Sequence, residues 1–383
     1  MERTIDECFF QIQNGANIKQ GNIDGGFPIT RIETIANDKF NRDRMGYAGI
    51  TDVSKYESYV LEDGDLLMSH INSAQYLGRT VLYEKQEDET IIHGMNLLRL
   101  KARRDIINPA YARYCFYAHP FRSQVANITK KSVNQASFAV TDLKKIKIDV
   151  PEIEEQNSVV DKLDRIRCII DQRNEELEQL DNLIKARFVE LTNKWNASEL
   201  PLSDVLDDIT YGFTNPMPDS DVGPWKITAK DVVNGHVNFE TARKTTQEAY
   251  DLLTAKSKPI IGDVLLTKDG TLGRTAIVED EKLCVNQSVA VLRCNNKVLP
   301  RFLTLLLQLP EYQAEMTKNS GGGTIKHIYI TKVDKMLVKI PDIIAQKEFI
   351  SFVEQVDKSK VAVQKALDEA QLLFDSLMQE YFG

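Results

Sequence analysis

The residues of this chain with the clearest potential for chemistry lie in short polar loops that recur in pairs. Residues 130–135 are rich in lysine and amide side chains, and residues 319–327 are rich in glycine and end in a lysine and a histidine. Lys and Arg displace counterions from phosphates, whereas Asn and Gln suit adenine edges and Lys or His suits guanine or phosphate. We therefore predict that these loops bind double-stranded DNA. Ordinary solvated loops without a ligand remain the alternative on composition alone.

Two further pairs of loops follow the same logic. Residues 14–17 align with 211–214, and residues 69–72 align with 268–271, and the surrounding sequence matches better than the loop tips do. Two domains that recognise different base sequences would need the same surrounding fold and different residues in the loops. In the first half the candidate DNA-binding residues are Asn14, Asn17, Ser69, His70, Asn72, Lys130, Lys131, Ser132, Asn134 and Gln135. In the second half they are Tyr211, Phe213, Thr214, Lys268, Thr271, Arg274, Ser320, Gly322, Thr324, Lys326 and His327.

No catalytic or cofactor-binding constellation is visible in the sequence. The five histidines show no ligand spacing with cysteines or carboxylates, so we expect no metal site. The glycine-containing segments miss the spacing of a P-loop or a dinucleotide-binding turn, and there is no nucleophile elbow. The sequence therefore predicts a binding protein with no catalytic residue and no cofactor of its own.

The composition is that of a soluble globular protein. The 383 residues are 42% hydrophobic and 27% charged, which is enough for two or three domains. Five scattered cysteines without C-x-x-C spacing, and carboxylates where a signal peptide would be basic and then apolar, favour a cytoplasmic protein. The most apolar run, 302–309, is too short for a membrane span.

The net charge of −8 argues against a wholly basic nucleic-acid coat, but it hides local excesses. Residues 99–147 hold 11 basic against 2 acidic side chains, and residues 293–339 hold 8 against 3. Residues 152–192 hold 6 basic against 11 acidic side chains. We therefore expect a polyanion to bind the parts of the chain that carry the loops and not the acidic segment.

The loops belong to a chain that repeats once. Residues 64–68 match 262–266, and residues 77–80 match 272–275, at offsets of 198 and 195. Within each half, short apolar or alternating runs broken by Gly, Asn and Asp predict strands, and helical stretches follow them. The fold class is therefore α+β, with two pseudo-repeated α/β domains separated by two long antiparallel coiled-coil helices. The predicted divisions are 1–150 and 196–340 for the domains and 151–195 and 341–383 for the long helices.

The two long helices are predicted from a heptad seam that begins after Pro151 and recurs after Pro341. The first, at residues 152–193, would be about 63 Å long at 1.5 Å per residue. A shared register favours a pair formed inside the chain, and pairing with another molecule is the alternative. The predicted seam residues are Val159, Leu163, Ile166, Leu177, Leu180, Ile184, Phe349, Val353, Val356, Val363, Leu367 and Phe374.

This tandem plan, together with three motifs, resembles the specificity (S) subunit of type I restriction-modification systems. One motif is a Pro-x-x-x-x-Gln start to each long helix, at 151–156 and 341–346. Another is a Gly-Asp strand followed by Leu-Gly-Arg-Thr, and the third is the glycine-rich loop at 320–328. The resemblance covers nearly the whole chain.

The resemblance implies two target recognition domains that each read one half of a split DNA site, with the long helices fixing the distance between the halves. It also implies that the helices bind two methyltransferase (modification) subunits, which bring S-adenosylmethionine and methylate adenine. Restriction motor-nuclease subunits, which bring ATP and Mg²⁺, would join to cleave DNA. The chain itself would select the target and would not be an enzyme.

Three alternatives remain open at this point. The chain could be a coiled-coil interaction or scaffold protein without DNA specificity, which would show no salt-steep DNA binding. It could be a self-sufficient restriction enzyme, although no nuclease or methyltransferase motif is found. It could also be the specificity subunit of a related multisubunit methyltransferase that lacks a type I nuclease.

Overall fold

The computed structural model describes residues 1–20, 25–131, 135–194, 197–233, 235–279, 282–318 and 327–383. The chain divides into two compact units. Unit 1 comprises Met1–Asn174 and Lys365–Gly383, and unit 2 comprises Glu175–Gln364. Each unit therefore contains one strand-rich part and a segment of each long helix. Among the helices of the described residues, none combines the length and apolar character that a membrane span requires.

Unit 1 is built on a four-stranded antiparallel sheet of order β2-β6-β3-β5. Its strands are β1 (Glu2–Thr4), β2 (Phe9–Asn14), β3 (Leu66–Ser69), β4 (Ile71–Asn72), β5 (Thr80–Leu82), β6 (Leu97–Ala102), β7 (Lys130–Lys131), β8 (Ala136–Ser137) and β9 (Lys147–Asp149). Its short helices are α1 (Ile5–Cys8), α2 (Pro109–Tyr117), α3 (His119–Ile128) and α4 (Val140–Leu143), with 3-10 turns at Ile32–Asp38, Arg42–Arg44, Ser54–Tyr59 and Ala74–Tyr76.

Unit 2 repeats this plan, because its main sheet has the order β11-β19-β16-β17 with the same antiparallel pairing. Its strands are β10 (Ser198–Pro201), β11 (Leu206–Tyr211), β12 (Ser220–Ile227), β13 (Val232–Val233), β14 (His236–Val237), β15 (Arg243–Lys244), β16 (Val264–Thr267), β17 (Thr275–Ile277), β18 (Leu283–Val285), β19 (Val289–Cys294) and β20 (Leu337–Ile340). Its short helices are α6 (Gln247–Asp251), α7 (Pro300–Gln308), α8 (Pro310–Thr317) and α9 (Ile330–Val333), with 3-10 turns at Leu202–Val205, Ala229–Asp231 and Ala255–Ser257.

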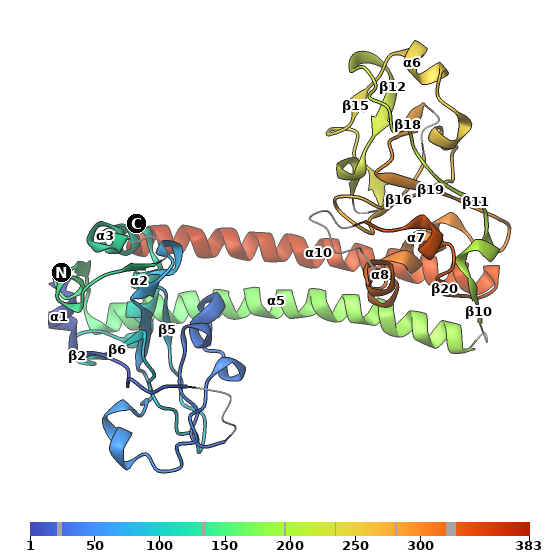
Figure 1. Cartoon of the computed structure of the whole chain (residues 1–383). Helices are drawn as coiled ribbons and strands as arrows, with labels where there is room; N and C mark the ends of the chain where they lie inside the picture. The colour runs from blue at the N-terminus through green and yellow to red at the C-terminus, as the bar shows by residue number, and fades with distance from the viewer. Residues whose placement is uncertain (21–24, 132–134, 195–196, 234, 280–281, 319–326) are drawn as a thin grey trace. The chain divides into compact units, whose positions relative to one another are not determined.

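The two long helices are α5 (Ile153–Lys194) and α10 (Ile343–Phe382), drawn green and red in Figure 1. The predicted first helix, 152–193, is thus correct to within one residue at each end. Both begin two residues after a proline, which cannot continue a preceding strand ladder and suits a helix entry. Acidic side chains in the first turn of α5 complement the positive end of the helix dipole.

Heptad residues of both helices pack together inside each unit. In unit 1 Leu163 and Phe374 share one core, and in unit 2 Ile184 packs against the core that holds Phe349. In unit 2 Asp181 also pairs with Lys360 at 2.5 Å, and Arg187 with Glu348 at 2.5 Å, so the two helical segments of this unit run antiparallel. Within each unit, heptad residues of the two long helices thus pack against each other. The half-buried members of the predicted seam are Leu177, Leu180, Ile184 and Leu367.

The glutamine of each Pro-x-x-x-x-Gln motif joins its helix to the strand-rich part of its unit. Gln346 is fully buried, and its Oε1 accepts a hydrogen bond from the backbone N–H of Leu299 at 2.8 Å. Its Nε2 donates to the carbonyl oxygens of Lys297 at 2.7 Å and Pro341 at 2.9 Å. Gln156 makes the same three bonds in unit 1, to Asn108 N, Ile106 O and Pro151 O. The glutamine of the motif therefore acts as a buried clamp: it holds the start of the long helix to the backbone just before the helix α2 or α7.

Replacing Gln346 with alanine should lower the free energy of unfolding of unit 2 by about 3 kcal/mol, because each buried backbone group left unsatisfied costs about 1–3 kcal/mol. The measurement is urea unfolding of the full chain. The matched control is Gln355→Ala, an exposed glutamine on the same helix, which should change stability by less than about 0.5 kcal/mol. Equal losses in the two variants would contradict the clamp.

Candidate nucleic-acid interface

Three of the predicted loops of unit 2 meet in one cluster. Asp269 and His327 form an antiparallel bridge, and the backbone N–H of Ile328 donates to the carbonyl of Lys268 at 2.8 Å. The Asp269 carboxylate lies 2.5 Å from His327 Nδ1 and 2.7 Å from Lys268 Nζ. Lys268 Nζ also lies 5.7 Å from the centroid of the Tyr211 ring, within the range of a cation–π contact. We call Tyr211, Lys268, Asp269 and His327 the unit 2 loop cluster.

The chemistry of the loop cluster suits a polar, anionic partner. The rings of Tyr211 and His327 are about half exposed, with 47% of Tyr211 and 46% of the His327 side chain accessible. Asp269, at 19%, lies deeper between Lys268 and His327 and holds both donors in place. Sequence reasoning omitted Asp269, and the only signal for it was its place within the aligned pair at 268–271. A fixed Lys, His and Tyr can donate to phosphate or to base edges.

The remaining predicted residues of unit 2 lie at different distances from this cluster. Phe213 and Thr214 line a hollow of about 530 Å³ together with Tyr211. Thr271 is exposed, and its hydroxyl donates to Ala229 O at 3.2 Å. Arg274 is exposed where the turn after β16 leads into β17, and within the described residues it makes no contact with the loop cluster. Ser320, Gly322, Thr324 and Lys326 lie outside the described residues.

Glycine is required at the equivalent position of the first loop in both units. A Cβ on Gly212 would lie 1.7 Å from Val285 O, and one on Gly15 would lie 1.9 Å from Gly94 O. Both distances are far below any contact that a real side chain makes. The backbone of each loop therefore packs directly against the backbone of a segment that is distant in the sequence, at Val285 in unit 2 and at Gly94 in unit 1. A side chain does not fit there, so Gly recurs at this position while the neighbouring residues differ.

In unit 1 a small sheet of order β4-β8-β7 joins two of the predicted loops. Ile71 and Asn72 pair with Ser137 and Ala136, and β7 adds Lys130 and Lys131 on the other side. Both lysines are exposed, and Gln135 is exposed as well. Exposed Asn14 and Asn17 flank Ala16, whose N–H donates to His93 O at 2.8 Å. Ser132 and Asn134 lie outside the described residues.

Two predicted contact residues of unit 1 are buried. Ser69 is 1% exposed and His70 is 6% exposed. Burial lowers the pKa of His70 to about 4, so its ring is neutral at physiological pH. The last residue of β3 and the one after it face the interior here, so their side chains are not presented to a ligand. Asn72, which is half-buried, is the polar side chain of this loop nearest to solvent.

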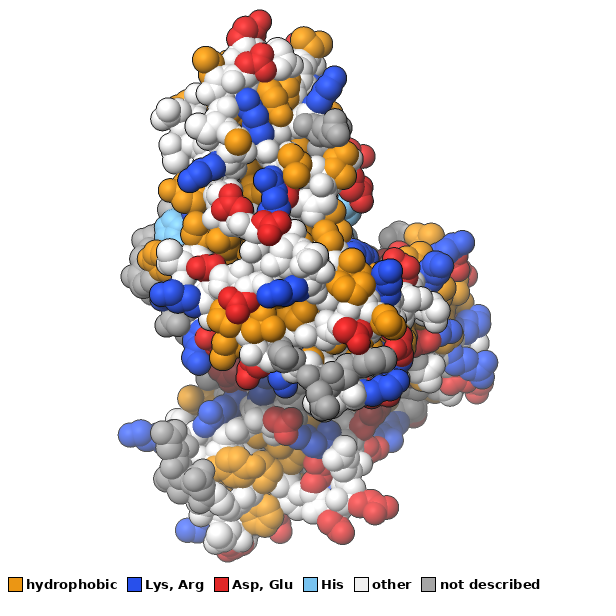
Figure 2. Space-filling model, turned by 90° about the vertical axis from the view of Figure 1, so that its right-hand side faces the viewer, with side chains coloured by type: hydrophobic (Ala, Val, Ile, Leu, Met, Phe, Trp, Pro, Cys, Tyr) orange, Lys and Arg blue, Asp and Glu red, His pale blue; other side chains and the backbone are white. Residues whose placement is uncertain are grey.

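Six of the 11 basic residues of 99–147 form ion pairs within the described part of unit 1. The pair of Arg99 with Asp65 is buried, whereas ion pairs at the surface are worth about 0.2–1 kcal/mol each and can yield to phosphates. In unit 2, on the face that Figure 2 turns toward the viewer, Lys and Arg side chains are likewise interspersed with Asp and Glu. Lys130 and Lys131 form no ion pair within the described part of the chain. The paired residues are Arg99 with Asp65, Lys101 with Glu62, Arg113 with Asp164, Lys144 with Asp6, Lys145 with Asp142 and Lys147 with Glu2.

The double variant Lys130→Ala, Lys131→Ala should weaken DNA binding to a similar extent for all base sequences. The slope of log affinity against log salt should fall by about 2, because each lysine that contacts a phosphate releases about one counterion. Fluorescence anisotropy of labelled duplexes at several salt concentrations measures both effects. The control is Lys347→Ala, Lys358→Ala, two exposed lysines on α10. An unchanged slope would rule out phosphate contacts by β7.

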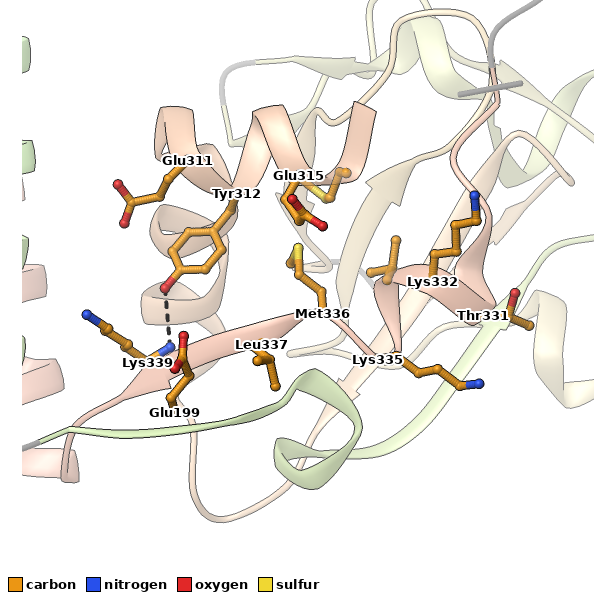
Figure 3. Close-up of a pocket in the computed structure, with 12 residues that line it drawn as sticks. Glu199, Glu311, Tyr312, Glu315, Thr331, Lys332, Lys335, Met336, Leu337 and Lys339 are labelled. Carbon is orange, nitrogen blue, oxygen red and sulfur yellow. Dashed lines mark hydrogen bonds between the residues drawn. The ribbon is translucent and has the colours of Figure 1, made fainter. Parts of the chain in front are cut away.

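A separate pocket of about 750 Å³ in unit 2 lies between α8, α9, β10 and β20 (Figure 3). The hydrogen bond drawn there joins the backbone N–H of Lys339 to the Tyr312 hydroxyl at 3.2 Å. Glu311 and Glu315 project from α8 on one side, and Lys332 and Lys335 lie on the other. The described residues include no group of His, Cys, Asp and Glu that could hold a metal ion. The pocket contains none of the predicted DNA-binding residues.

Comparisons with known proteins agree on one family. The family described as the type I restriction modification DNA specificity domain matches residues 2–180 and 219–370. A protein of Methanocaldococcus jannaschii, described as the specificity subunit of type I restriction enzyme MjaX, is 26% identical over 395 residues, which cover 95% of this chain and 90% of the relative.

Two solved structures have a similar fold. The S subunit of a type I restriction-modification system from M. genitalium matches with a TM-score of 0.56 and 14% identity, covering all of this chain and 96% of the other. A chain from a structure of the type I R-M system matches with a TM-score of 0.59 and 17% identity, covering all of this chain and 97% of the other. The α+β repeat and the paired long helices are thus shared with these proteins.

Proposed function

The chain belongs to the type I restriction modification DNA specificity family, and from this premise we propose that its two strand-rich parts read the two halves of a split DNA target. As a specificity subunit of a type I restriction-modification system it is not an enzyme by itself. This chain recognises the target sequence, and partner subunits catalyse the reactions on DNA.

The unit 2 loop cluster is the observation that carries the assignment of the reading surface. It unites side chains from the loops 211–214, 268–271 and 327, which lie far apart in the sequence, through contacts of 2.5–2.8 Å and a cation–π pair. Base recognition needs donors and acceptors held in fixed positions by the fold. In unit 1 the corresponding surface comprises Asn14, Asn17, Asn72 and the β7 lysines.

The partners are proposed to be two methyltransferase subunits and restriction motor-nuclease subunits. S-adenosylmethionine, ATP and Mg²⁺ would be bound by those partners. Adenine methylation and DNA cleavage would then occur where this chain places them.

We further propose that the two long helices set the gap between the two halves of the target. Deleting one heptad from both α5 and α10 removes about 10 Å from each helix at 1.5 Å per residue. The allowed gap should therefore shorten by about three base pairs, since B-DNA rises about 3.4 Å per base pair. Selection of binding sites from a duplex library with variable gaps measures this. An unchanged gap would contradict the proposal.

The overall function is tested by mapping modified bases in genomic DNA from cells that carry this gene and its neighbours, with and without a deletion of this gene alone. A split adenine-methylation motif should disappear with the deletion, and the lost motif gives both half-sites. Unchanged methylation in cells that express an active partner methyltransferase would show that this chain does not direct it.

A further inference from the structure

One turn in unit 2 lies between two of the predicted reading loops and was not among the predicted contacts. It comprises Asn286, Gln287 and Ser288 and links β18 to β19 (Figure 1). The backbone N–H of Gln287 donates to Phe213 O at 2.8 Å. On its other side, the backbone N–H of Lys268 donates to Ser288 O at 2.9 Å. The turn is therefore hydrogen-bonded to the loop 211–214 and to the loop 268–271 at once.

The residues on either side of Gln287 hold the turn in shape. Asn286 Oδ1 accepts hydrogen bonds from the Ser288 hydroxyl at 2.5 Å and from the Ser288 backbone N–H at 3.1 Å. Ser288 Oγ in turn accepts from the backbone N–H of Ala229 at 3.0 Å. Gln287 itself is exposed, and its side-chain amide makes no hydrogen bond to the described residues. A rigid backbone thus presents one polar side chain outward.

The repeat places the same turn in unit 1, with a different side chain at its tip. The backbone N–H of Met95 donates to Ala16 O at 3.1 Å, as that of Gln287 does to Phe213 O. The parallel bridges Ala16 to Gly94 and Phe213 to Asn286 confirm this equivalence. Asn96 follows with a positive φ of 78°, which is not the case for Ser288 at the equivalent position in unit 2.

Met95 presents an apolar side chain to solvent. Met95 is 43% exposed at the tip of this turn, although its thioether side chain is apolar. Gln287 occupies the same position in unit 2 with a polar amide. The backbone bond to the first loop is alike in the two units, whereas the residue presented at the tip and its neighbours differ. Different side chains at the same position of a repeated turn are expected where the two units bind different base pairs.

We propose that Gln287 and Met95 are specificity-determining residues, each reading one base pair in its own half of the target. The inference rests on the proposed function of the loops as DNA readers. The Gln287 amide can donate to and accept from one adenine edge in the major groove, whereas Met95 offers an apolar contact to a thymine methyl group. The two half-sites therefore differ in the chemistry that is read at this position.

The test is selection of binding sites by the full chain from duplexes randomised in both half-sites, with wild type compared with Gln287→Ala and Met95→Ala. Gln287→Ala should reduce the preference for adenine at one position of one half-site by about 5- to 150-fold and leave the other half-site unchanged. Met95→Ala should reduce a thymine preference in the other half-site alone. Gln355→Ala, on α10, is the matched control and should leave both half-sites unchanged.

Gln287→Glu adds a result that a merely misfolded protein cannot give. A carboxylate at this position should shift the preference from adenine towards cytosine, whose exocyclic amine donates to it. If Gln287→Ala weakens binding equally at every sequence, or leaves all preferences unchanged while the β7 lysine variant still reduces the salt slope, the inference is overturned and the DNA-binding proposal stands. If the wild-type chain shows neither a salt-dependent affinity nor any sequence preference, the proposed function itself fails.

Discussion

Replacing Phe349 with alanine is expected to lower the free energy of unfolding of unit 2 by about 3–5 kcal/mol. Phe349 is 1% exposed and lies on α10. Its ring centroid is 5.6 Å from that of Phe188 on α5 and 5.7 Å from that of Phe302 on α7, both in edge-to-face geometry. The substitution removes buried apolar surface and leaves a cavity among rings that cannot all move inward. It therefore loosens the contact that joins both long helices to the strand-rich part of the unit.

Denaturant unfolding of the full chain, followed by circular dichroism, measures this loss. The control is Val361→Ala, an apolar residue of the same helix that is 71% exposed, and it should cost less than about 1 kcal/mol. A loss below about 1 kcal/mol for Phe349→Ala would show that the aromatic cluster is not a principal contact of unit 2. Sequence reasoning missed Phe188, because it lies one residue beside the predicted heptad seam, where its ring contacts Phe302 on α7 and Tyr312 on α8 as well as Phe349.

The stability of unit 1 is expected to fall as the pH decreases from about 7.5 to about 5, by about 4 kcal/mol in total, with most of the loss below about pH 6.5. His70 and His93 are buried, and burial lowers their pKa values to about 4 and about 3. His93 Nε2 lies 3.0 Å from Leu97 O, so it is the donor of a neutral ring. In the unfolded chain both rings bind a proton near pH 6.5, whereas in the fold they do not. Each unit of pH below 6.5 therefore costs about 1.4 kcal/mol for each histidine.

Urea unfolding at pH 7.5, 6 and 5 measures this dependence, in a range where Asp and Glu side chains with ordinary pKa values remain ionised. The double variant His70→Gln, His93→Gln should lose most of the dependence, because glutamine does not titrate. His119→Gln, at an exposed position, should retain the wild-type profile. A profile that is the same in the double variant and the wild type would assign the pH dependence to other groups.

How far the sequence predicted the candidate interface varies from loop to loop. The aligned pairs named 268–271 and 327 as parts of separate candidate loops, and the structure places Asp269 beside His327. They did not predict that Asp269 would join Lys268 and His327, since that contact links segments 58 residues apart in the sequence. The turns at Met95 and Gln287 carried no motif. Only the hydrogen bonds to Ala16 and Phe213 identify them.

The sequence by itself determined the repeat, the two long helices and the family, because these depend on periodicity and on motifs of neighbouring residues. Heptad spacing and a proline mark where α5 and α10 begin without reference to the rest of the chain. Only the tertiary structure decided which charges are neutralised, which loop side chains are buried and what Gln156 and Gln346 bind. Lys147 pairs with Glu2, and Gln156 clamps the backbone of Asn108. Burial and pairing of this kind depend on residues that are distant in sequence, so no local pattern can specify them.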